Sequence, residues 1–263
     1  MDRIRELHLL VDGREIAQNT RMRLRGRSTM TLRPDVWELT VIGITDQTIA
    51  AIENAELIEV EGNDLSLLCR GQVEEVYTHS ENGKIETTVM ISDGMDFWLS
   101  TVNLAMAGGN SVKDTIRYLV SRCTAPVPIT AMQSKDATFS RGQAFHGRTA
   151  GYVATLAKSV KARAFFTRGN LAIMTMNIAN DTVLLSEDDI SGIVSRANGA
   201  CIVKLAEMRG FPIGQLVQLP NDAEKYRLLC QSIDADSYQG VWQTELIMVE
   251  EKKIATGDDW GGG

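Results

Sequence analysis

The stretch Lys84-Ile-Glu-Thr-Thr-Val-Met-Ile91 alternates between two faces, with β-branched or apolar residues at every odd position. This period of two is typical of a half-buried β-strand. Asn82-Gly83, directly before it, tolerates the positive φ angles of a tight hairpin turn. We therefore predict that Cys69–His79 and Lys84–Ile91 form one long antiparallel hairpin.

In the first arm of this hairpin the alternation is interrupted at Glu74-Glu75, between Val73 and Val76. One extra residue in a strand produces such an interruption, and the resulting irregularity is a β-bulge. We predict a bulge here, and we expect the meander Leu57–Ile91 to form the wall of a small barrel or sandwich. A second such wall is expected later in the chain.

The outer segments of the chain read as strands, whereas the middle segment mixes helix and strand. A short helix is expected over 45–55, capped by Thr45, and two helices begin at Ser111 and Thr149. After Asp181 the strand pattern returns, with a turn at Asn198-Gly199 and a long hairpin after it.

The predicted fold class is therefore mainly β with an α/β insert, in which two small antiparallel β-barrel domains flank a mixed α/β domain. The predicted domains are a first β-barrel over 1–106, the α/β insert over 107–180, a second β-barrel over 181–255, and a flexible tail over 256–263.

The 263 residues carry a formal net charge of -7, which argues against tight nucleic-acid binding by the whole surface. No run of about 18 apolar residues exists, so no membrane insertion is expected. The N-terminus lacks the apolar centre of a signal peptide, which predicts synthesis in the cytoplasm without export. The cysteines have no CxxC spacing and are interpreted as reduced residues of strands or core: Cys69, Cys123, Cys201 and Cys230.

An arginine-rich strand is expected near the N-terminus. If the segment is extended, its four arginines share one face, and Met22 and Leu24 lie on the other. Those arginines are Arg21, Arg23, Arg25 and Arg27. Their partner could be carboxylates of the same chain, an acidic surface of another subunit or protein, or phosphate. We assign them, together with Trp260 in the tail, as candidate partner-interface residues.

The sequence motifs indicate no catalytic, cofactor-binding or metal-binding residue. The histidines His8, His79 and His146 lie far apart and lack metal-ligand spacing. Gly108-Gly109-Asn110 precedes a helix but has no lysine partner for an anion. The acidic cluster Glu187–Asp189 is interpreted as solvated charge. A structural, non-enzymatic protein is therefore expected.

Several sequence segments, taken in order along the chain, resemble the central baseplate hub proteins of tailed phages and of related contractile injection machines. They are Pro34–Gly43, Ile58–Glu61, Leu68–Val76, Thr87–Gly94, Phe145–Thr149, Phe165–Ile173 and Phe211–Pro220. The resemblance spans nearly the whole chain, and it rests on the order and spacing of these segments.

The resemblance implies a homotrimer that adapts the sixfold tail tube to the threefold central spike. It implies contacts with the tail tube protein, the spike protein and other baseplate proteins, in a virion tail assembled in the host cytoplasm. It also implies a lumen through which the tape-measure protein and DNA pass without specific binding during ejection. No cofactor follows from it.

Two other functions stay open at this point. A tail-tube or distal-tail structural protein would form hexamers. A β-rich hydrolase would depend on cryptic carboxylates such as Glu187, Asp188 or Asp189.

Overall fold

The structure is a computed structural model that describes residues 6–17, 20–62, 66–81, 84–175, 181–197 and 199–254. The chain divides into two compact units. Unit 1 comprises Met1–Thr29, Asp35–Asp93 and Asp181–Glu250, and unit 2 comprises Met30–Pro34, Gly94–Asn180 and Glu251–Gly263. The two outer segments of the chain therefore fold together, and the middle segment belongs to a separate unit.

The described residues of unit 1 form strands, one α-helix and one short 3₁₀ helix. Its first half contains β1 (His8–Val11), β2 (Arg14–Ile16), β3 (Arg21–Thr29), β4 (Asp35–Ile42), α1 (Asp46–Glu53), β5 (Ile58–Glu61), β6 (Leu67–Glu81) and β7 (Lys84–Asp93). Its second half contains β13 (Thr182–Leu184), η1 (Glu187–Asp189), β14 (Ile190–Ala197), β15 (Ala200–Leu205), β16 (Leu216–Gln218), β17 (Lys225–Asp236) and β18 (Val241–Glu250).

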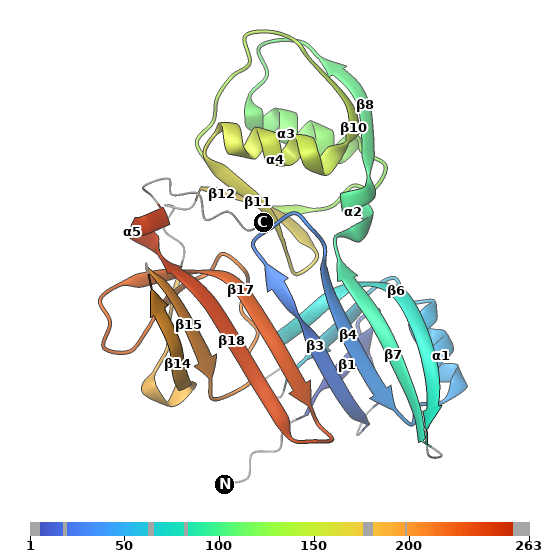
Figure 1. Cartoon of the computed structure of the whole chain (residues 1–263). Helices are drawn as coiled ribbons and strands as arrows, with labels where there is room; N and C mark the ends of the chain where they lie inside the picture. Colours follow the sequence, from blue (N-terminus) through green and yellow to red (C-terminus); the bar gives the residue numbers. More distant parts are fainter. Residues whose placement is uncertain are drawn as a thin grey trace. The chain divides into compact units, whose positions relative to one another are not determined.

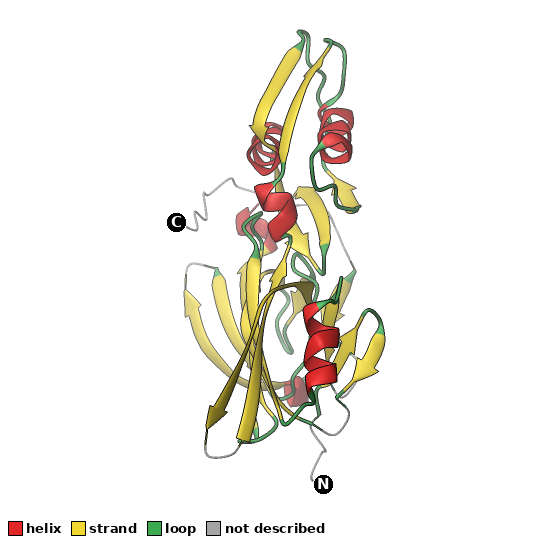
Figure 2. Ribbon diagram, turned by 90° about the vertical axis from the view of Figure 1, so that its right-hand side faces the viewer, coloured by secondary structure: helices red, strands yellow, loops and turns green. Residues whose placement is uncertain are grey.

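These strands form one 13-stranded sheet. Its main path runs β14-β15-β18-β17-β3-β4-β7-β6-β5-β1-β2, and β16 joins both β17 and β13. Figure 1 shows β14, β15, β18, β17, β3, β4 and β7 following one another across the sheet. Figure 2 shows from the side how strongly the strands of this sheet twist and curl.

The two halves of unit 1 repeat one topology. In the first module the ladder runs β3-β4-β7-β6-β5-β1, and in the second module it runs β14-β15-β18-β17-β16-β13. The strands also follow one another along the chain in the same sequence in both modules. One difference is that β1 pairs with β5 in antiparallel orientation, whereas β13 pairs with β16 in parallel orientation.

The long hairpins of the two modules match in detail. The predicted bulge in β6 is confirmed, since the register shifts between Val73 and Glu75 and leaves Glu74 unpaired. In β17 the register shifts between Leu228 and Cys230, which leaves Leu229 unpaired. The last paired residue of each strand, Glu81 or Asp236, lies seven residues beyond its bulge. The hairpins can therefore be aligned residue by residue.

The expected pair of closed barrels is not observed in the described part of the chain. Closing the first module would require β3 to find a partner at the far end of its own ladder. Instead, the free edge of β3 pairs with β17 of the second module, from Arg23↔Asp236 to Thr29↔Cys230. The sheet stays open because this pairing extends it from one module into the next.

A buried hydrophobic cluster in unit 1 is formed mainly by residues of the first module. Predicted inward residues Trp37, Leu39 and Val41 are buried, as are Met22 and Leu24 on β3. Gly26 stands directly opposite Trp37 in the ladder. A Cβ built on Gly26 would lie 2.4 Å from an indole carbon of Trp37. The missing side chain therefore leaves the space that the indole ring fills.

Unit 2 mixes helices with two small sheets. It contains α2 (Met95–Leu99), β8 (Thr101–Met106), α3 (Val112–Arg122), β9 (Ile129–Gln133), β10 (Gln143–Arg148), α4 (Thr149–Ser159), β11 (Ala162–Thr167), β12 (Asn170–Thr175) and α5 (Glu251–Ile254). One sheet pairs β8 with β10, and the other has the order β11-β12-β9. The predicted start of α3 is confirmed, because Ser111 Oγ accepts a hydrogen bond from Asp114 N at 3.1 Å.

The compact units group the chain differently from the predicted domains. The outer segments share one sheet, and residues 94–106 join the middle segment because Phe97 and Val102 are buried in the core of unit 2. None of the four cysteines, all of which lie in the described ranges, is part of a disulfide: Cys69, Cys123 and Cys201 are buried, and Cys230 is half-buried. Burial raises the pKa of the Cys69 thiol, which disfavours the reactive thiolate.

Candidate assembly surface

The arginine-rich strand β3 lies where the two modules meet. Its buried residues Met22 and Leu24 face the core, so the four arginines occupy the opposite face, as expected from the alternation. At the junction between modules β3 pairs along one edge with β17, which carries Asp234 and Asp236 directly opposite Arg25 and Arg23. Two of the four arginines, Arg23 and Arg25, thus lie opposite carboxylates of their own chain at the junction between modules.

Two ion pairs cross this junction. Arg25 Nε donates to Asp234 Oδ1 at 2.9 Å, and Arg23 Nε lies 3.8 Å from Asp236 Oδ2. The first pair is about half exposed on both sides, so it contributes only about 0.2–1 kcal/mol. The Asp236 side chain is buried, and its other oxygen accepts hydrogen bonds from the backbone of Tyr238 and Gln239. Asp236 therefore stabilises both the junction and the turn after β17.

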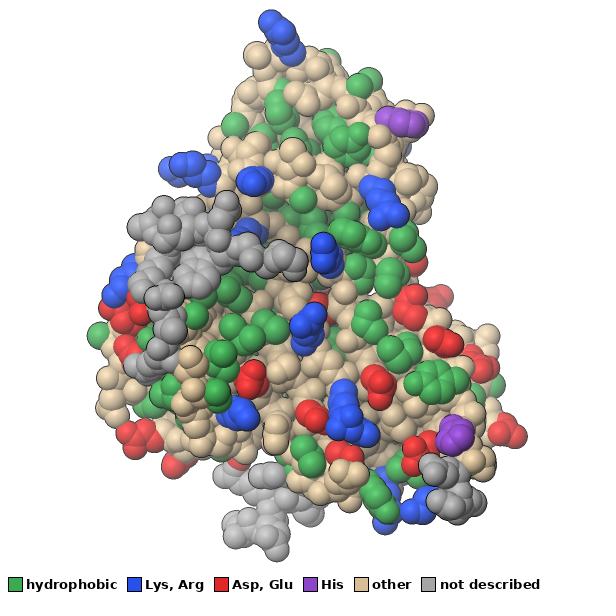
Figure 3. All heavy atoms as spheres, in the orientation of Figure 1, with side chains coloured by type: hydrophobic (Ala, Val, Ile, Leu, Met, Phe, Trp, Pro, Cys, Tyr) green, Lys and Arg blue, Asp and Glu red, His purple; other side chains and the backbone are tan. Residues whose placement is uncertain are grey.

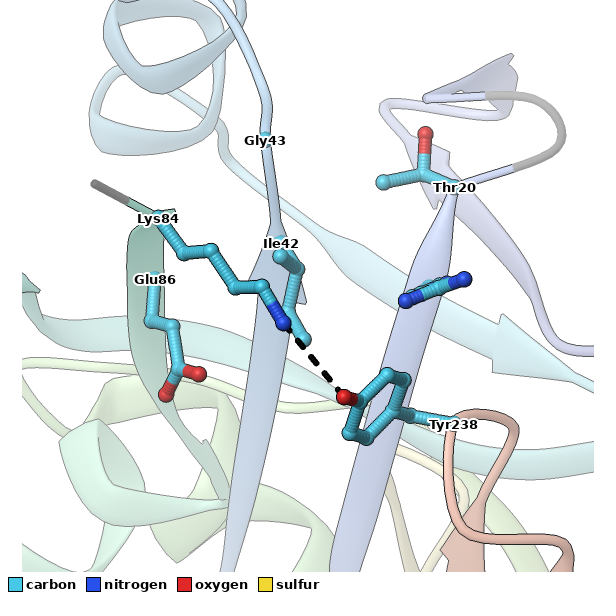
Figure 4. Close-up of a pocket in the computed structure, with 7 residues that line it drawn as sticks. Thr20, Ile42, Gly43, Lys84, Glu86 and Tyr238 are labelled. Atoms are coloured by element: carbon cyan, nitrogen blue, oxygen red, sulfur yellow. Dashed lines mark hydrogen bonds between the residues drawn. The ribbon is translucent and has the colours of Figure 1, made fainter. Parts of the chain in front are cut away.

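A shallow pocket lies at the end of β3, where Figure 4 shows Lys84 approaching the ring of Tyr238. Arg21 lines the same pocket. Lys84 Nζ donates to Tyr238 Oη at 3.3 Å, and the Arg21 guanidinium carbon lies 4.7 Å from the ring centroid. Both cations lie over the electron-rich face of the exposed Tyr238 ring, with Lys84 Nζ 5.1 Å from its centroid, and such contacts contribute about 0.5–1 kcal/mol. Thr20 and Glu86 line the same pocket. These contacts attach the β17–β18 turn to the first module.

Arg27, at the other end of the row, lies near a buried carboxyl. Burial raises the pKa of Asp35 to about 6, although hydrogen bonds from Thr29 and the charge of Arg27 oppose the shift. Thr29 N and Thr29 Oγ1 each donate to the Asp35 carboxylate at 2.8 Å. Asp35 also stands opposite the buried Asp93 in the ladder between β4 and β7.

The assembly role predicted for Arg21, Arg23, Arg25 and Arg27 stays a prediction, since no second copy is present to test it. Trp260 lies outside the described residues. The sequence contains a signal for the intrachain partner of two of these arginines. Asp234 and Asp236 repeat the two-residue spacing of Arg23 and Arg25, as expected of complementary strands.

The acidic cluster considered for catalysis serves as a helix cap and a loop contact. Asp189 Oδ2 accepts hydrogen bonds from Ser186 N at 2.7 Å and Ser186 Oγ at 2.8 Å, which hold the pKa of Asp189 below its ordinary value. Glu187 accepts a hydrogen bond from Asn221 at 2.7 Å. Nor do the described residues contain a group of three or more His, Cys, Asp or Glu side chains that could hold a metal ion.

Within the described residues, no helix has both the length and the apolar character needed to cross a bilayer. No protein-family model and no curated protein matches the sequence. Solved structures do match over nearly its whole length. A tail protein from Neisseria meningitidis aligns over 97% of this chain and 98% of its own, with a TM-score of 0.65 and 12% identity.

This chain has the fold of phage tail proteins. A 43 kDa tail protein of the prophage MuSo2 from Shewanella oneidensis aligns over 94% of this chain and 98% of its own, with a TM-score of 0.67 and 11% identity. An E. coli component of the type VI secretion system, itself described as similar to tail proteins of bacteriophage T4, aligns over 92% of this chain and 76% of its own. Its TM-score is 0.62 at 9% identity.

The resemblance expected from the sequence is thus confirmed at the level of fold. At identities near 10%, the shared property is the backbone arrangement, and the functions of these proteins are not transferred with it.

Proposed function

We propose that this chain is the structural baseplate hub of a phage tail or a related injection machine. Three copies form a ring that joins the sixfold tail tube to the threefold central spike. The fold shared with tail proteins supports this function, and so does the internal organisation of unit 1.

The observation that carries the proposal is the repeated module. Each chain contains two ladders with the same strand order and long hairpins that align at their bulges. A protein that must match six tube subunits with three copies needs two similar surfaces in each copy. The repeat supplies them, although the modules are joined in one open sheet and do not form two separate barrels.

The open face of the sheet suits a channel for DNA. On this face the carboxylates of Asp234 and Asp236 lie next to Arg25 and Arg23, so they offset the positive charge that would attract a phosphate. Figure 3 shows acidic and basic side chains mixed over unit 1 on the side turned to the viewer. With a net charge of -7, such a wall lets DNA pass without the counterion-release binding of a basic surface.

In this role the chain is not an enzyme. Its partners are the tail tube protein, the central spike protein and other baseplate proteins, and its place is the tail baseplate of the virion. The tape-measure protein and DNA pass through the lumen of the ring without specific binding.

The test is the native mass of the purified protein together with negative-stain images. A threefold ring of three chains with a central hole is the expected result. A ring of six chains would overturn the hub and favour a tail-tube or distal-tail protein. A monomer with a hydrolytic activity that disappears on changing Glu187, Asp188 or Asp189 would favour the hydrolase.

A further inference from the structure

Several strand edges of unit 1 have no ladder partner in the part of the chain that the structure describes, among them the outer edges of the short strands β2 and β13. Two further open edges belong to the long strand β6 and to β14. Along one edge β6 pairs with β7, and along the other only its first part, Leu67–Gly71, pairs with β5. The rest of that second edge, over 75–81, is open. At the opposite end of the sheet β14 pairs with β15 alone. Open edges of this kind are templates for pairing with another chain.

The structure contains a partner for the equivalent edge. In the second module β17 takes the place of β6, and one edge of β17 pairs first with β16 and then, over Cys230–Asp236, with β3. The strand β3 takes the place of β14, because each is the first strand of its module ladder. The pairing of β17 with β3 is therefore the same contact that an edge of β6 and an edge of β14 would make.

Exposure distinguishes the paired edge from the open ones. In β17 the stretch Cys230–Asp236 has no exposed residue, because β3 and the core cover it. In β6 the equivalent positions Tyr77–Ser80 are all exposed, and Tyr77 retains 47% of its accessible surface. In β14 two consecutive apolar side chains, Ile193 and Val194, are 46% and 55% exposed. Exposed apolar residues on an unpaired edge indicate an interaction surface.

We propose that the edge of β6 over 75–81 in one copy pairs antiparallel with β14 of a neighbouring copy and reproduces the intrachain contact of β17 with β3. The contact is head-to-tail, because each copy offers a different edge to each neighbour. Such contacts close into a ring when the rotation per copy allows it. Since every junction then has the same form, modules follow one another around the ring in equal steps.

Side chains at equivalent positions support this contact. Ile193 takes the place of Leu24, which is fully buried in the core of unit 1. Ile85, which is 44% exposed, takes the place of Trp242, which packs against the core that contains Leu24. Pairing between copies would bring Ile193 and Ile85 together and remove both from water.

The alignment also fixes the register. Asp234 stands opposite Arg25 in the intrachain junction. His79 occupies the position of Asp234 in its hairpin, and Ser195 occupies the position of Arg25 in its ladder. Ser195 lies beyond both register shifts of β14, so its place follows directly from its partner Ile202. His79 of one copy is therefore expected opposite Ser195 of the next.

Cysteine cross-linking tests this register. Residues directly opposite one another in an antiparallel pair have Cβ atoms about 4.5–5.5 Å apart, close to the range of a disulfide. The double variant His79→Cys/Ser195→Cys, oxidised as the assembled protein, is expected to shift most of the chain into covalent multimers on a non-reducing gel. Reduction should restore the single-chain band. Each single variant should stay at background, which also controls for the native cysteines.

A matched control is His79→Cys/Ser140→Cys, since Ser140 is exposed but belongs to unit 2 and to neither of the two strands in the proposed contact. A second arm is Val194→Lys, which places a charge on the edge and should reduce ring formation at least tenfold while leaving the circular dichroism spectrum unchanged. Tyr118→Lys, at an exposed position on α3, is its control.

This inference rests on the proposed function, and the experiment separates the two. If wild-type rings of three form while His79→Cys/Ser195→Cys gives no cross-link and Val194→Lys assembles normally, the edge contact is wrong and the hub stands. If the series of cross-linked bands on the gel ends at six chains, the edge contact holds and the hub is overturned. If the wild-type chain never assembles, both fail.

Discussion

Asp35 offers a direct measurement of how the junction region responds to pH. Its carboxyl is largely removed from water at the start of β4, and burial raises its pKa from 3.8 to about 6. One pKa unit corresponds to about 1.4 kcal/mol, so ionising Asp35 in the native protein costs about 3 kcal/mol relative to the unfolded chain. Asp35→Asn keeps the shape and an oxygen that can accept from Thr29 N, and it removes the charge.

The direction in which pH changes the unfolding free energy follows from proton binding to Asp35. Between about pH 4 and pH 6 the native protein binds the Asp35 proton more tightly than the unfolded chain does. The stability linked to this carboxyl is therefore present below pH 4 and is lost as the pH rises through 6. Asp35→Asn should be close to wild type at pH 4, apart from a constant offset. It should exceed wild type by up to about 3 kcal/mol above pH 7.

The assay is urea unfolding at fixed protein concentration from pH 4 to pH 8, followed by tryptophan fluorescence, since Trp37 is buried in the same unit. The quantity of interest is the difference in unfolding free energy between variant and wild type at each pH. Asp188→Asn, at an exposed position, is the control and should give a nearly flat difference. Parallel curves for Asp35→Asn and wild type across the whole range would refute the reasoning.

Three further predictions concern packing, capping and charge. Gly26→Ala should lower the unfolding free energy by about 1–3 kcal/mol, because the new methyl group overlaps the indole ring opposite it. Gly151→Ala, at an open helical position, should raise it by about 0.5–1 kcal/mol. Thermal unfolding compares the two variants, and changes of the same sign would contradict the packing argument. Ser111→Ala should cost about 1 kcal/mol through loss of the α3 cap, measured by the same scan. A double-mutant cycle on Arg25 and Asp234 should give a coupling free energy of about 0.2–1 kcal/mol that shrinks in 1 M salt. A coupling free energy that does not change with salt would show that the pair is not acting as an exposed ion pair.

Local features of the fold were predictable because their causes lie within a few residues of one another. Alternation predicted β6 and β7, and a break in that alternation predicted the bulge at Glu74. Ser111 predicted the start of α3 by the same local logic, since its hydroxyl accepts from a backbone N–H three residues on. The face of β3 that carries the arginines was also predictable, because side chains alternate along any strand.

The candidate site was only partly predictable. The sequence identified the arginines and left three kinds of partner open, and the structure supplies one of them for Arg23 and Arg25 in the carboxylates of β17. That pairing joins residues about two hundred positions apart, and a strand pattern contains no information about which distant edge a strand will choose. The unpaired edges of β6 and β14 were unpredictable for the same reason.

The sequence by itself determined where strands, turns and caps form, which faces are apolar, and that both outer segments end in a long hairpin. Only the tertiary structure decided that β3 pairs with β17, that the two modules form one open sheet, and that their ladders repeat. The physical reason is that backbone hydrogen bonds along a strand edge are nearly independent of sequence. The choice among edges is therefore made by the packing of the whole core, and not by the pattern of any one strand.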